Sequence, residues 1–508
     1  MQGISTGAIF FIIGIYFLFL ILISYFTSGN SKNEDFFIGG RKSPWFVVAF
    51  GMIGATLSGV TFISVPGWVT DSQFSYLQTV FGYLLGYIVI AFVLMPMYYR
   101  LRLTSIYTYL EQRFGTRSYK TGAAYFLLSR TIGASFRLYL VVIVLQTFVM
   151  NQFGIPFAGT ILITIGLIWI YTYRGGIRTI IWTDTLQTAS MLIAVCTTIY
   201  FVGDAMGWSF SEIFEQVGGS EYSKVWFFEG GWSDPRNFFK QFFGGMFITI
   251  VMTGLDQDMM QKNLSCRNIG DAQKNMLSFS VILIFANILF LSLGALLYLY
   301  ASQNGIEVPT RMVSGVEKEA TDLMYPTLAL QHLHPVVGVS FLIGLIAAAY
   351  SSADSALTAL TTSFCIDFLG FDKSDASEES KKKKRLLVHI GISILLFWVI
   401  MLFYYINDDA VINSLFTMAG YTYGPLLGLY AFGFFINKGV NDQLIPAICI
   451  ASPLITFLLD TFSEELLWGY KFSFELLIVN GLLTFLGMLL ISKKTDHSFK
   501  HLLSRWHI

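Results

Sequence analysis

The chain has 508 residues, of which 55% are hydrophobic and only 13% are charged, and its formal net charge at pH 7 is zero. About a quarter of the residues of a soluble protein are charged, so this composition excludes an ordinary soluble domain. The balanced charge also gives no reason to expect nucleic acid as a partner. The cysteines are too widely spaced to predict a disulfide or a zinc site; they are Cys196, Cys266, Cys365 and Cys449.

Apolar runs of roughly 20 residues, the length that crosses a bilayer as a helix, recur along the whole chain. They predict an all-α polytopic membrane protein, since a β-barrel would show short alternating segments instead. The first run lacks the basic start and the cleavage pattern of a signal peptide. The sequence predicts about 13 transmembrane helices, at 6–27, 44–68, 74–99, 119–149, 157–173, 178–203, 240–263, 276–301, 336–368, 386–406, 410–436, 443–461 and 470–492.

Lysine and arginine residues test this count, because they collect in short cytoplasmic loops. With the N-terminus outside, the predicted inner segments hold 24 of the 32 Lys and Arg residues and the outer segments hold six, while Arg130 and Arg137 fall within a span. The basic run Lys381–Arg385 lies in an inner loop, where it is either a solvated topology signal or a binding site for lipid headgroups. We therefore predict a plasma (inner) membrane protein with its N-terminus outside and its C-terminus in the cytoplasm.

The stretch AAYSSADSALT, Ala348–Thr358, places an acid and several hydroxyl groups at membrane depth. Hydroxyl oxygens beside a carboxylate suit a hard cation. Hydroxyl groups that bond back to their own helix are the alternative, but they leave Asp354 unexplained, because an unpaired carboxylate at depth is strongly unfavourable. At about 100° per residue, Asp354 and Ser352 flank a helix face that holds Ser351, Ser355, Thr358 and Thr362.

Two spans contain residues that weaken a helix. GMIGATLSGVTFISVPG, Gly51–Gly67, combines four glycines, several hydroxyl groups and a proline. Such interruptions are tolerated in a membrane only against protein or a water-filled cavity, although small residues also serve close helix packing. In MTGLDQDMMQKN, Met252–Asn263, Asp256 and Asp258 approach the inner surface, so a polar helix end is expected, and an interruption at Gly254 is the alternative.

Three more ionisable residues fall within spans. Asp184 lies about two turns from the inner end of its span, where an interfacial carboxylate is as reasonable as a buried functional one. Arg130 and Arg137 are seven residues apart and therefore share a helix face. Two arginines inside a span need partners. Pairing with Asp354 or Asp184 is the expected arrangement, and an anionic group of a substrate is the alternative.

In these stretches the sequence resembles the sodium:solute symporter family, which includes sodium-coupled transporters of sialic acid, glucose, proline and choline. The resemblance covers nearly the whole chain. It rests on four segments that occur in this order: NEDFFIGGRKSPWF, ATLSGVTFISVPG, YTYRGGIRTIIWTDTLQ and AAAYSSADSALTAL. It implies a leucine-transporter-type fold with two inverted five-helix repeats, which bind substrate where the first helix of each repeat is broken.

The resemblance also implies an organisation of the chain into five parts. A first transmembrane helix and the loop after it occupy 1–43, and the first inverted repeat, with spans two to six, occupies 44–203. An extracellular loop follows at 204–239. The second inverted repeat, with spans seven to eleven, occupies 240–436. Two C-terminal helices and a cytoplasmic tail occupy 437–508.

Cation sites follow from the same resemblance. The family's common sodium site maps onto Gly54, Leu57, Ala348, Ser351 and Ser352. A second sodium site, which only some members have, maps onto Asp184, Asp354 and Ser355. Members with two sodium ions usually carry a small hydroxyl residue where Asp354 stands. Three roles are therefore open for Asp354: ligand of a second ion, carrier of a proton, or partner of an arginine.

The sequence thus predicts a sodium-coupled secondary active symporter that imports a small organic solute by alternating access. Its partners would be Na⁺, the solute and the lipid bilayer, with no nucleic acid and no obligate protein partner. A carboxylate-bearing solute such as a sialic acid is the expected class, because an arginine can meet a carboxylate. A neutral sugar or polyol, an amino acid and choline are the alternatives. The candidate solute contacts are Ser58, Thr61, Gln78, Arg137, Thr253 and Asp256.

Two other classes of protein fit the sequence less well. An ion channel would need rings of charge or carbonyl groups along a continuous pore, whereas two broken helices in matching repeats favour alternating access. An enzyme is not expected, because the chain has neither an H-E-x-x-H metal helix nor a G-x-S-x-G nucleophile turn. His332 and His334 are two residues apart and do not share a helix face.

Overall fold

The computed structural model describes residues 6–28, 33–173, 176–313, 316–406 and 411–493. The predicted tail beyond Lys493 lies outside these residues. Most of the described chain is helical. The strands form two short antiparallel pairs: β1 (Thr310–Val313) with β2 (Val316–Glu319), and β3 (Gly439–Val440) with β4 (Ser492–Lys493).

The helices follow the predicted spans to within a few residues at most ends, because the apolar runs that define the spans also define the helices. Their bounds are α1 (Thr6–Ser28), α2 (Asn33–Ile38), α3 (Trp45–Thr56), α4 (Gly59–Ser72), α5 (Tyr76–Val89), α6 (Met95–Arg100), α7 (Thr108–Arg113), α8 (Thr116–Phe148), α9 (Phe157–Thr172), α10 (Ile177–Ala205), α11 (Phe210–Gly219), α12 (Phe238–Thr249), α13 (Gln257–Leu264), α14 (Ile269–Gln303), α15 (Met324–Thr327), α16 (Pro335–Ser363), α17 (Glu378–Ile406), α18 (Val411–Phe435), α19 (Ile445–Thr461), α20 (Ser463–Leu466) and α21 (Leu476–Leu490).

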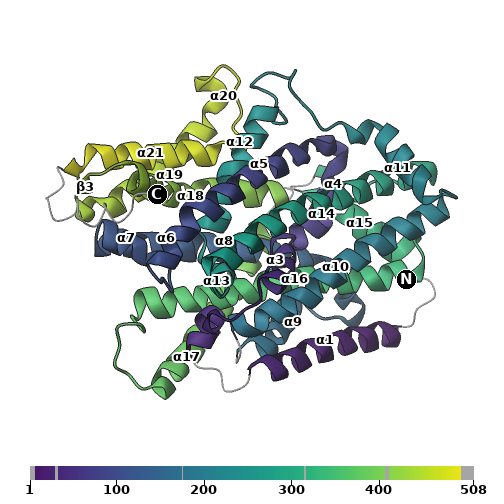
Figure 1. Cartoon of the computed structure of the whole chain (residues 1–508). Coiled ribbons are helices and arrows are strands. Elements are labelled where there is room, and N and C mark those ends of the chain that lie inside the picture. Colours follow the sequence, from purple (N-terminus) through teal and green to yellow (C-terminus); the bar gives the residue numbers. More distant parts are fainter. Residues whose placement is uncertain (1–5, 29–32, 174–175, 314–315, 407–410, 494–508) are drawn as a thin grey trace.

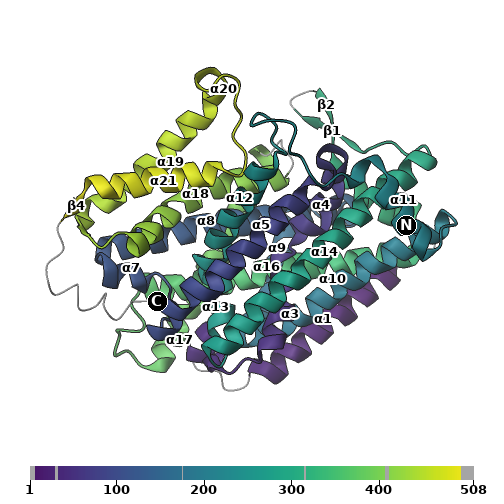
Figure 2. The same cartoon turned by 45° about the horizontal axis from the view of Figure 1, so that its top comes forward.

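The long helices form a bundle whose two ends differ (Figures 1 and 2). In Figure 2 many of them run diagonally across the view. The β1–β2 hairpin and α11 lie at one end, which we call the hairpin end. The opposite end holds α7 and the start of α17, and we call it the α7 end. Between them, α10 packs along α16, and α3 packs against both.

The helix with the hydroxyl-rich stretch, α16, lies deepest in the bundle. In its most apolar stretch 78% of the residues are buried, against 28% for α17 and 22% for the helix that contains α19. Large apolar side chains on these outer helices are exposed, among them Trp398 and Leu454. Such a surface would be unfavourable in water and is expected against lipid. The polar groups of α16 are therefore buried in protein, away from the lipid.

Helix length and composition give a count of membrane crossings. Among the described residues, seven helices are long and apolar enough to cross a membrane, or eight if the bent pair Phe238–Gly254 and Gln257–Leu264 forms one span. Shorter apolar helices accompany them, including α3 and α9. The count of about 13 and the division into repeats at 44–203 and 240–436 stay predictions.

Candidate functional site

The first break lies between α3 and α4, within the glycine-rich stretch that the sequence singles out. Leu57 (φ −76°, ψ 69°) and Ser58 (φ −71°, ψ 179°) leave the helical region, and the helix resumes at Gly59. The carbonyl groups at the end of α3, including those of Gly54 and Leu57, therefore lose their usual amide partners. The interruption predicted for this span is confirmed.

The glycines of the same stretch pack α3 closely against α10, which is the alternative that the sequence left open. A β-carbon on Gly54 would overlap the Thr188 side chain, and one on Gly51 would press on Asp184. The amide of Gly54 donates a hydrogen bond of 3.0 Å to the Thr188 hydroxyl. Helix interruption and close packing thus occur together, and they bring the end of α3 beside Asp184.

The second break lies between α12 and α13. A π-helical turn, Ile250–Gly254, ends the first half, and Leu255 and Asp256 are not helical before α13 begins. The two halves bend by 64°. The structure therefore shows the interruption at Gly254, which the sequence left as the alternative to a polar helix end.

The polar residues after this break lie inside the protein. The Asp256 carboxylate accepts hydrogen bonds from the amides of Asp258 (2.9 Å) and Met259 (3.3 Å), and from the Tyr423 hydroxyl (2.6 Å). Asp256 and Asp258 are both 0% exposed. They therefore do not form a solvated polar helix end, which is what the sequence favoured for this stretch. All of α13 is buried, so its polar groups need partners within the bundle.

A cavity lies beside the two breaks. Its volume is about 80 Å³, well below the roughly 300 Å³ of an ordinary ligand pocket, so it must widen before it takes a solute as large as a sugar. A second cavity of about 620 Å³ shares only Phe416 with it among their lining residues. Four predicted solute contacts line the smaller cavity: Ser58, Thr61, Arg137 and Thr253. Further polar and aromatic residues also line it, among them Thr56, Tyr76, Tyr83, Tyr87, Thr249 and Asn287.

Gln78, a fifth candidate, is not among the residues that line this cavity. Its Nε2 donates hydrogen bonds of 2.9 Å to the Arg236 carbonyl and to Gln241 Oε1, and its Oε1 accepts one of 3.0 Å from the Phe227 amide. It is 0% exposed. This amide ties α5 to the segment before α12. Asp256, the sixth candidate, is not among the lining residues either, and caps α13 as described above.

The two arginines of α8 have different surroundings. Arg130 forms a buried ion pair with Asp258. Arg137 lines the cavity, is 9% exposed, and has no ion-pair partner in the part of the chain that the structure describes. Its Nε makes no hydrogen bond there. The expected pairing of these arginines with Asp354 or Asp184 is wrong, because the acid that reaches Arg130 comes from α13.

The residues implied for the common sodium site belong to two helices that are in contact, the end of α3 and the middle of α16. Gly54, Leu57, Ala348, Ser351 and Ser352 are all buried, and α3 is in contact with α16. The Ser352 hydroxyl, on a residue 1% exposed, has no hydrogen-bond partner among the described residues. A buried hydroxyl without a partner is uncommon. Together with the carbonyl groups freed by the break, it offers the oxygen ligands that a hard cation prefers, so these residues fit a sodium ion.

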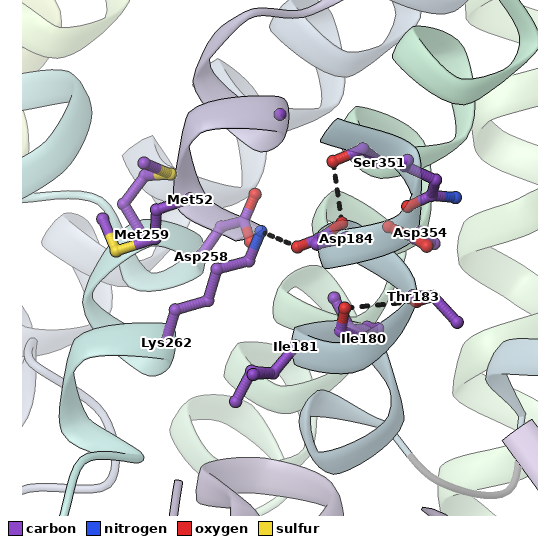
Figure 3. Close-up of polar contacts among 12 residues, drawn as sticks. Met52, Ile180, Ile181, Thr183, Asp184, Asp258, Met259, Lys262, Ser351 and Asp354 are labelled. Carbon is purple, nitrogen blue, oxygen red and sulfur yellow. Dashed lines mark hydrogen bonds and ion pairs between the residues drawn. The ribbon is translucent and has the colours of Figure 1, made fainter. Parts of the chain in front are cut away.

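Asp184 is fully engaged at this place (Figure 3). Its Oδ2 lies 2.6 Å from Lys262 Nζ, and its Oδ1 accepts a hydrogen bond of 2.7 Å from the Ser351 hydroxyl. Asp184 is 0% exposed, so it is not an interfacial carboxylate. Sequence reasoning missed Lys262, although this lysine falls within the predicted span 240–263 and an ionisable residue there signals a buried partner.

Asp354 has an aromatic hydroxyl as its partner. Tyr171 donates a hydrogen bond of 2.9 Å to Asp354 Oδ2. Asp354 Oδ1 has no hydrogen-bond partner among the described residues, and neither do the hydroxyl groups of Ser355 and Thr358. In Figure 3 Asp354 lies beside Asp184, on the side away from Lys262. No arginine pairs with Asp354 among the described residues, so the structure does not support the arginine role that was open for it.

Known proteins resemble this chain over most of its length. A match to the sodium:solute symporter family covers residues 36–443. The sodium/sialic acid symporter SiaT of Proteus mirabilis (strain HI4320) is 25% identical over 451 residues, which cover 86% of each chain. The human sodium-coupled monocarboxylate transporter 1 is 25% identical, over 84% of this chain and 67% of that protein.

Solved structures share the fold. A sodium-coupled sialic acid symporter in a substrate-bound, outward-open state aligns with a TM-score of 0.80 and 22% identity, over 97% of this chain and 100% of that one. Mhp1, a nucleobase-cation-symport-1 family transporter, aligns with a TM-score of 0.54 and 15% identity, over 89% of this chain and 92% of that one. With a family match over most of its length and two broken helices around a central cavity, the chain belongs to the sodium:solute symporter family.

Proposed function

We propose that this chain imports a small carboxylate-bearing solute together with sodium. The observation that carries the proposal is Arg137, a buried guanidinium that lines the central cavity and has no ion-pair partner within the described residues. An uncompensated buried charge is unfavourable, and a guanidinium can bind a carboxylate through two parallel hydrogen bonds. The relatives that transport sialic acid and monocarboxylates act on solutes that carry this group.

Hydroxyl and amide groups around the guanidinium would orient the rest of the solute. Ser58 and Thr61 follow the first break, and Thr253 lies in the π turn before the second. Asn287 of α14 adds an amide whose Oδ1 has no hydrogen-bond partner in the described chain. A few such polar groups in a mostly apolar cavity fix the orientation of a small ligand. Phe416 lies between this cavity and the larger one, where it would control access.

The driving ion would bind where α3 meets α16. The carbonyl groups of Gly54, Leu57 and Ala348 and the hydroxyl groups of Ser351 and Ser352 would replace its hydration shell. This site adjoins the first break, and residues of that break also line the solute cavity. Sodium and solute would therefore each stabilise the arrangement of α3 and α4 that the other needs for binding. By linkage, solute and sodium then tighten each other's binding to the same degree. One charge that moves through 100 mV contributes about 2.3 kcal/mol.

A second cation is proposed at Asp354 and Ser355. Asp184 and Asp354 are both 0% exposed, and Lys262 supplies one ammonium group to Asp184, which leaves one negative charge. Asp354 Oδ1 and the Ser355 hydroxyl are without partners in the residues described. Asp184, the third member of the predicted set, is neutralised by Lys262 and would contribute a remaining oxygen lone pair, because each of its oxygens accepts only one contact among the described residues.

Asp354→Asn should therefore lower the sodium Hill coefficient of uptake from about two toward one, because it removes the charge that attracts the second ion. The measurement is the initial rate of solute uptake into proteoliposomes against sodium concentration. Asp367→Asn is the matched control: Asp367 is also fully buried near the end of the same long helix, but its carboxylate is bound by Tyr119 and Ser363. An unchanged Hill coefficient in Asp354→Asn would contradict the second site.

The proposed orientation has the hairpin end outside and the α7 end in the cytoplasm of a plasma membrane protein. The basic run Lys381–Arg385 belongs to the start of α17, which lies at the α7 end (Figure 2). Basic residues of short loops favour the cytoplasmic side. The N-terminus would then be outside.

A ligand screen tests the solute class. We expect a carboxylate-bearing solute to raise the melting temperature of the purified protein in sodium and to do so much less in potassium, because a ligand that binds the folded state stabilises it by mass action. Sialic acids, monocarboxylates, amino acids, neutral sugars and choline form the panel. A shift with neutral sugars or choline alone would refute the carboxylate proposal. Saturable uptake separates a symporter from an ion channel, which would show open-channel conductance instead.

A further inference from the structure

We propose that Lys262 is a positioning residue for the sodium site: through Asp184 it orients the Ser351 hydroxyl and so couples α13 to sodium binding. The inference rests on the sodium site proposed above. Lys262 is 1% exposed and is not among the residues that line the central cavity. A buried ion pair is weak evidence of a stabilising role by itself, so its place relative to Ser351 carries the argument.

The geometry is a chain of three residues (Figure 3). Lys262 Nζ lies 2.6 Å from Asp184 Oδ2, and Asp184 Oδ1 accepts the Ser351 hydroxyl at 2.7 Å. A serine hydroxyl has one hydrogen and two lone pairs. While its hydrogen points to Asp184, its lone pairs are free for a cation on the other side. Groups that bind a metal ligand in this way commonly change metal affinity by 10–100-fold when removed.

Lys262 fixes the carboxylate on which this orientation depends. Asp184 is 0% exposed, and the ammonium of Lys262 is the partner of its Oδ2. Without that contact the buried oxygen would be left unsatisfied, and the carboxylate would rotate toward another donor. Its Oδ1 would then no longer be held against the Ser351 hydroxyl.

The same contact connects the sodium site to the second broken helix. Lys262 lies on α13, which begins directly after the break beside the cavity, whereas Asp184 lies on α10. Arg130 of α8 holds the other end of α13 through Asp258. A displacement of α13 from α10 would lengthen the Lys262–Asp184 contact and release Ser351. Through Lys262, a movement of α13 would change sodium affinity, although α13 carries no proposed sodium ligand.

The test is a sodium titration of purified full-length variants, with and without solute, followed by thermal shift and calorimetry. Lys262→Met should weaken sodium binding about 10–100-fold and reduce the effect of solute on sodium affinity. Lys262→Arg should stay within about threefold of the original chain, because it keeps the charge. The double variant Lys262→Met with Asp184→Asn should recover most of the affinity, because the amide oxygen still accepts the Ser351 hydrogen without needing a counter-charge.

Lys240→Met is the matched control. Lys240 is another buried lysine of the same broken span, paired with Glu475 at 3.2 Å and bonded to the Trp232 and Lys471 carbonyls. Its loss should lower stability and leave sodium affinity unchanged. Sodium affinity in Lys262→Met that equals the original, or that falls no further than in Lys240→Met, overturns the proposal. So does a double variant that is no better than Lys262→Met.

If the proposed sodium site itself is wrong, the variants should behave differently. Ser352→Ala removes a proposed ligand that does not contact Lys262 or Asp184 in the structure. If Ser352→Ala binds sodium as well as the original chain, the site itself is wrong. If Ser352→Ala loses sodium binding and Lys262→Met does not, the site stands and only the role of Lys262 fails.

Discussion

Ser351→Ala combined with Ser352→Ala should abolish sodium-stimulated uptake and weaken sodium binding by roughly 100-fold or more. Both hydroxyl groups belong to α16, which is in contact with α3, and Ser352 has no hydrogen-bond partner among the described residues. Without them a dehydrated cation would keep only carbonyl ligands, and desolvation of an ion without full compensation is strongly unfavourable. Sodium titration of the purified protein and uptake into proteoliposomes measure the two effects.

Ser340→Ala is the control for this pair. Ser340 lies on the same helix, but its hydroxyl bonds back to the Val337 carbonyl at 3.0 Å. Its removal should change neither sodium affinity nor uptake. A double variant of Ser351 and Ser352 that keeps its sodium affinity would show that the cation binds elsewhere.

Arg137→Met should reduce uptake of the carboxylate-bearing solute by about 100-fold. The guanidinium lines the cavity and forms no ion pair among the described residues, so it can bind the carboxylate of the solute directly. Loss of one partner of a buried charge pair costs about 2–5 kcal/mol of binding free energy, and this range includes the free energy that corresponds to a 100-fold loss. Sodium binding without solute should remain, because Arg137 is not among the proposed ligands of the cation.

A neutral analogue of the solute, such as its amide or methyl ester, distinguishes charge recognition from loss of cavity shape. The original chain should prefer the carboxylate strongly, and Arg137→Met should lose that preference. Arg137→Lys should lie between the two, because an ammonium keeps the charge without the paired hydrogen bonds of a guanidinium. Equal loss of both solutes in Arg137→Met would indicate a structural role instead.

The helices and their two interruptions were predictable because they depend on local sequence. Apolar runs set the helix bounds, and glycine, hydroxyl and proline residues marked the stretch in which the first break occurs. Gly254 marked the second break in the same way. The exact break positions, such as Leu57 and Ser58, were less accessible, since they depend on how α3 and α4 pack against other helices.

Partner choice among the buried charges was not predictable from spacing. Arg130 meets Asp258, which is 128 residues away, and Lys262 meets Asp184, which is 78 residues away. Helix periodicity shows which residues share a face, but not which face of a distant helix lies opposite. Gln78 illustrates the same limit: it was a reasonable solute contact until its amide proved to be bound by Arg236, Gln241 and Phe227.

The first break also brings two helix ends of opposite partial charge close together. The end of α3 is a helix C-terminus, whose free carbonyl groups carry about half a negative charge, and the start of α4 is an N-terminus, whose free amides carry about half a positive charge. The carbonyl groups of Gly54 and Leu57 at the first end are proposed ligands of the cation, and Ser58, the residue that precedes α4, lines the cavity with Arg137. A single interruption of two residues therefore offers a carbonyl end for a cation and an amide end for an anionic group, as expected for a carrier that must bind both at once.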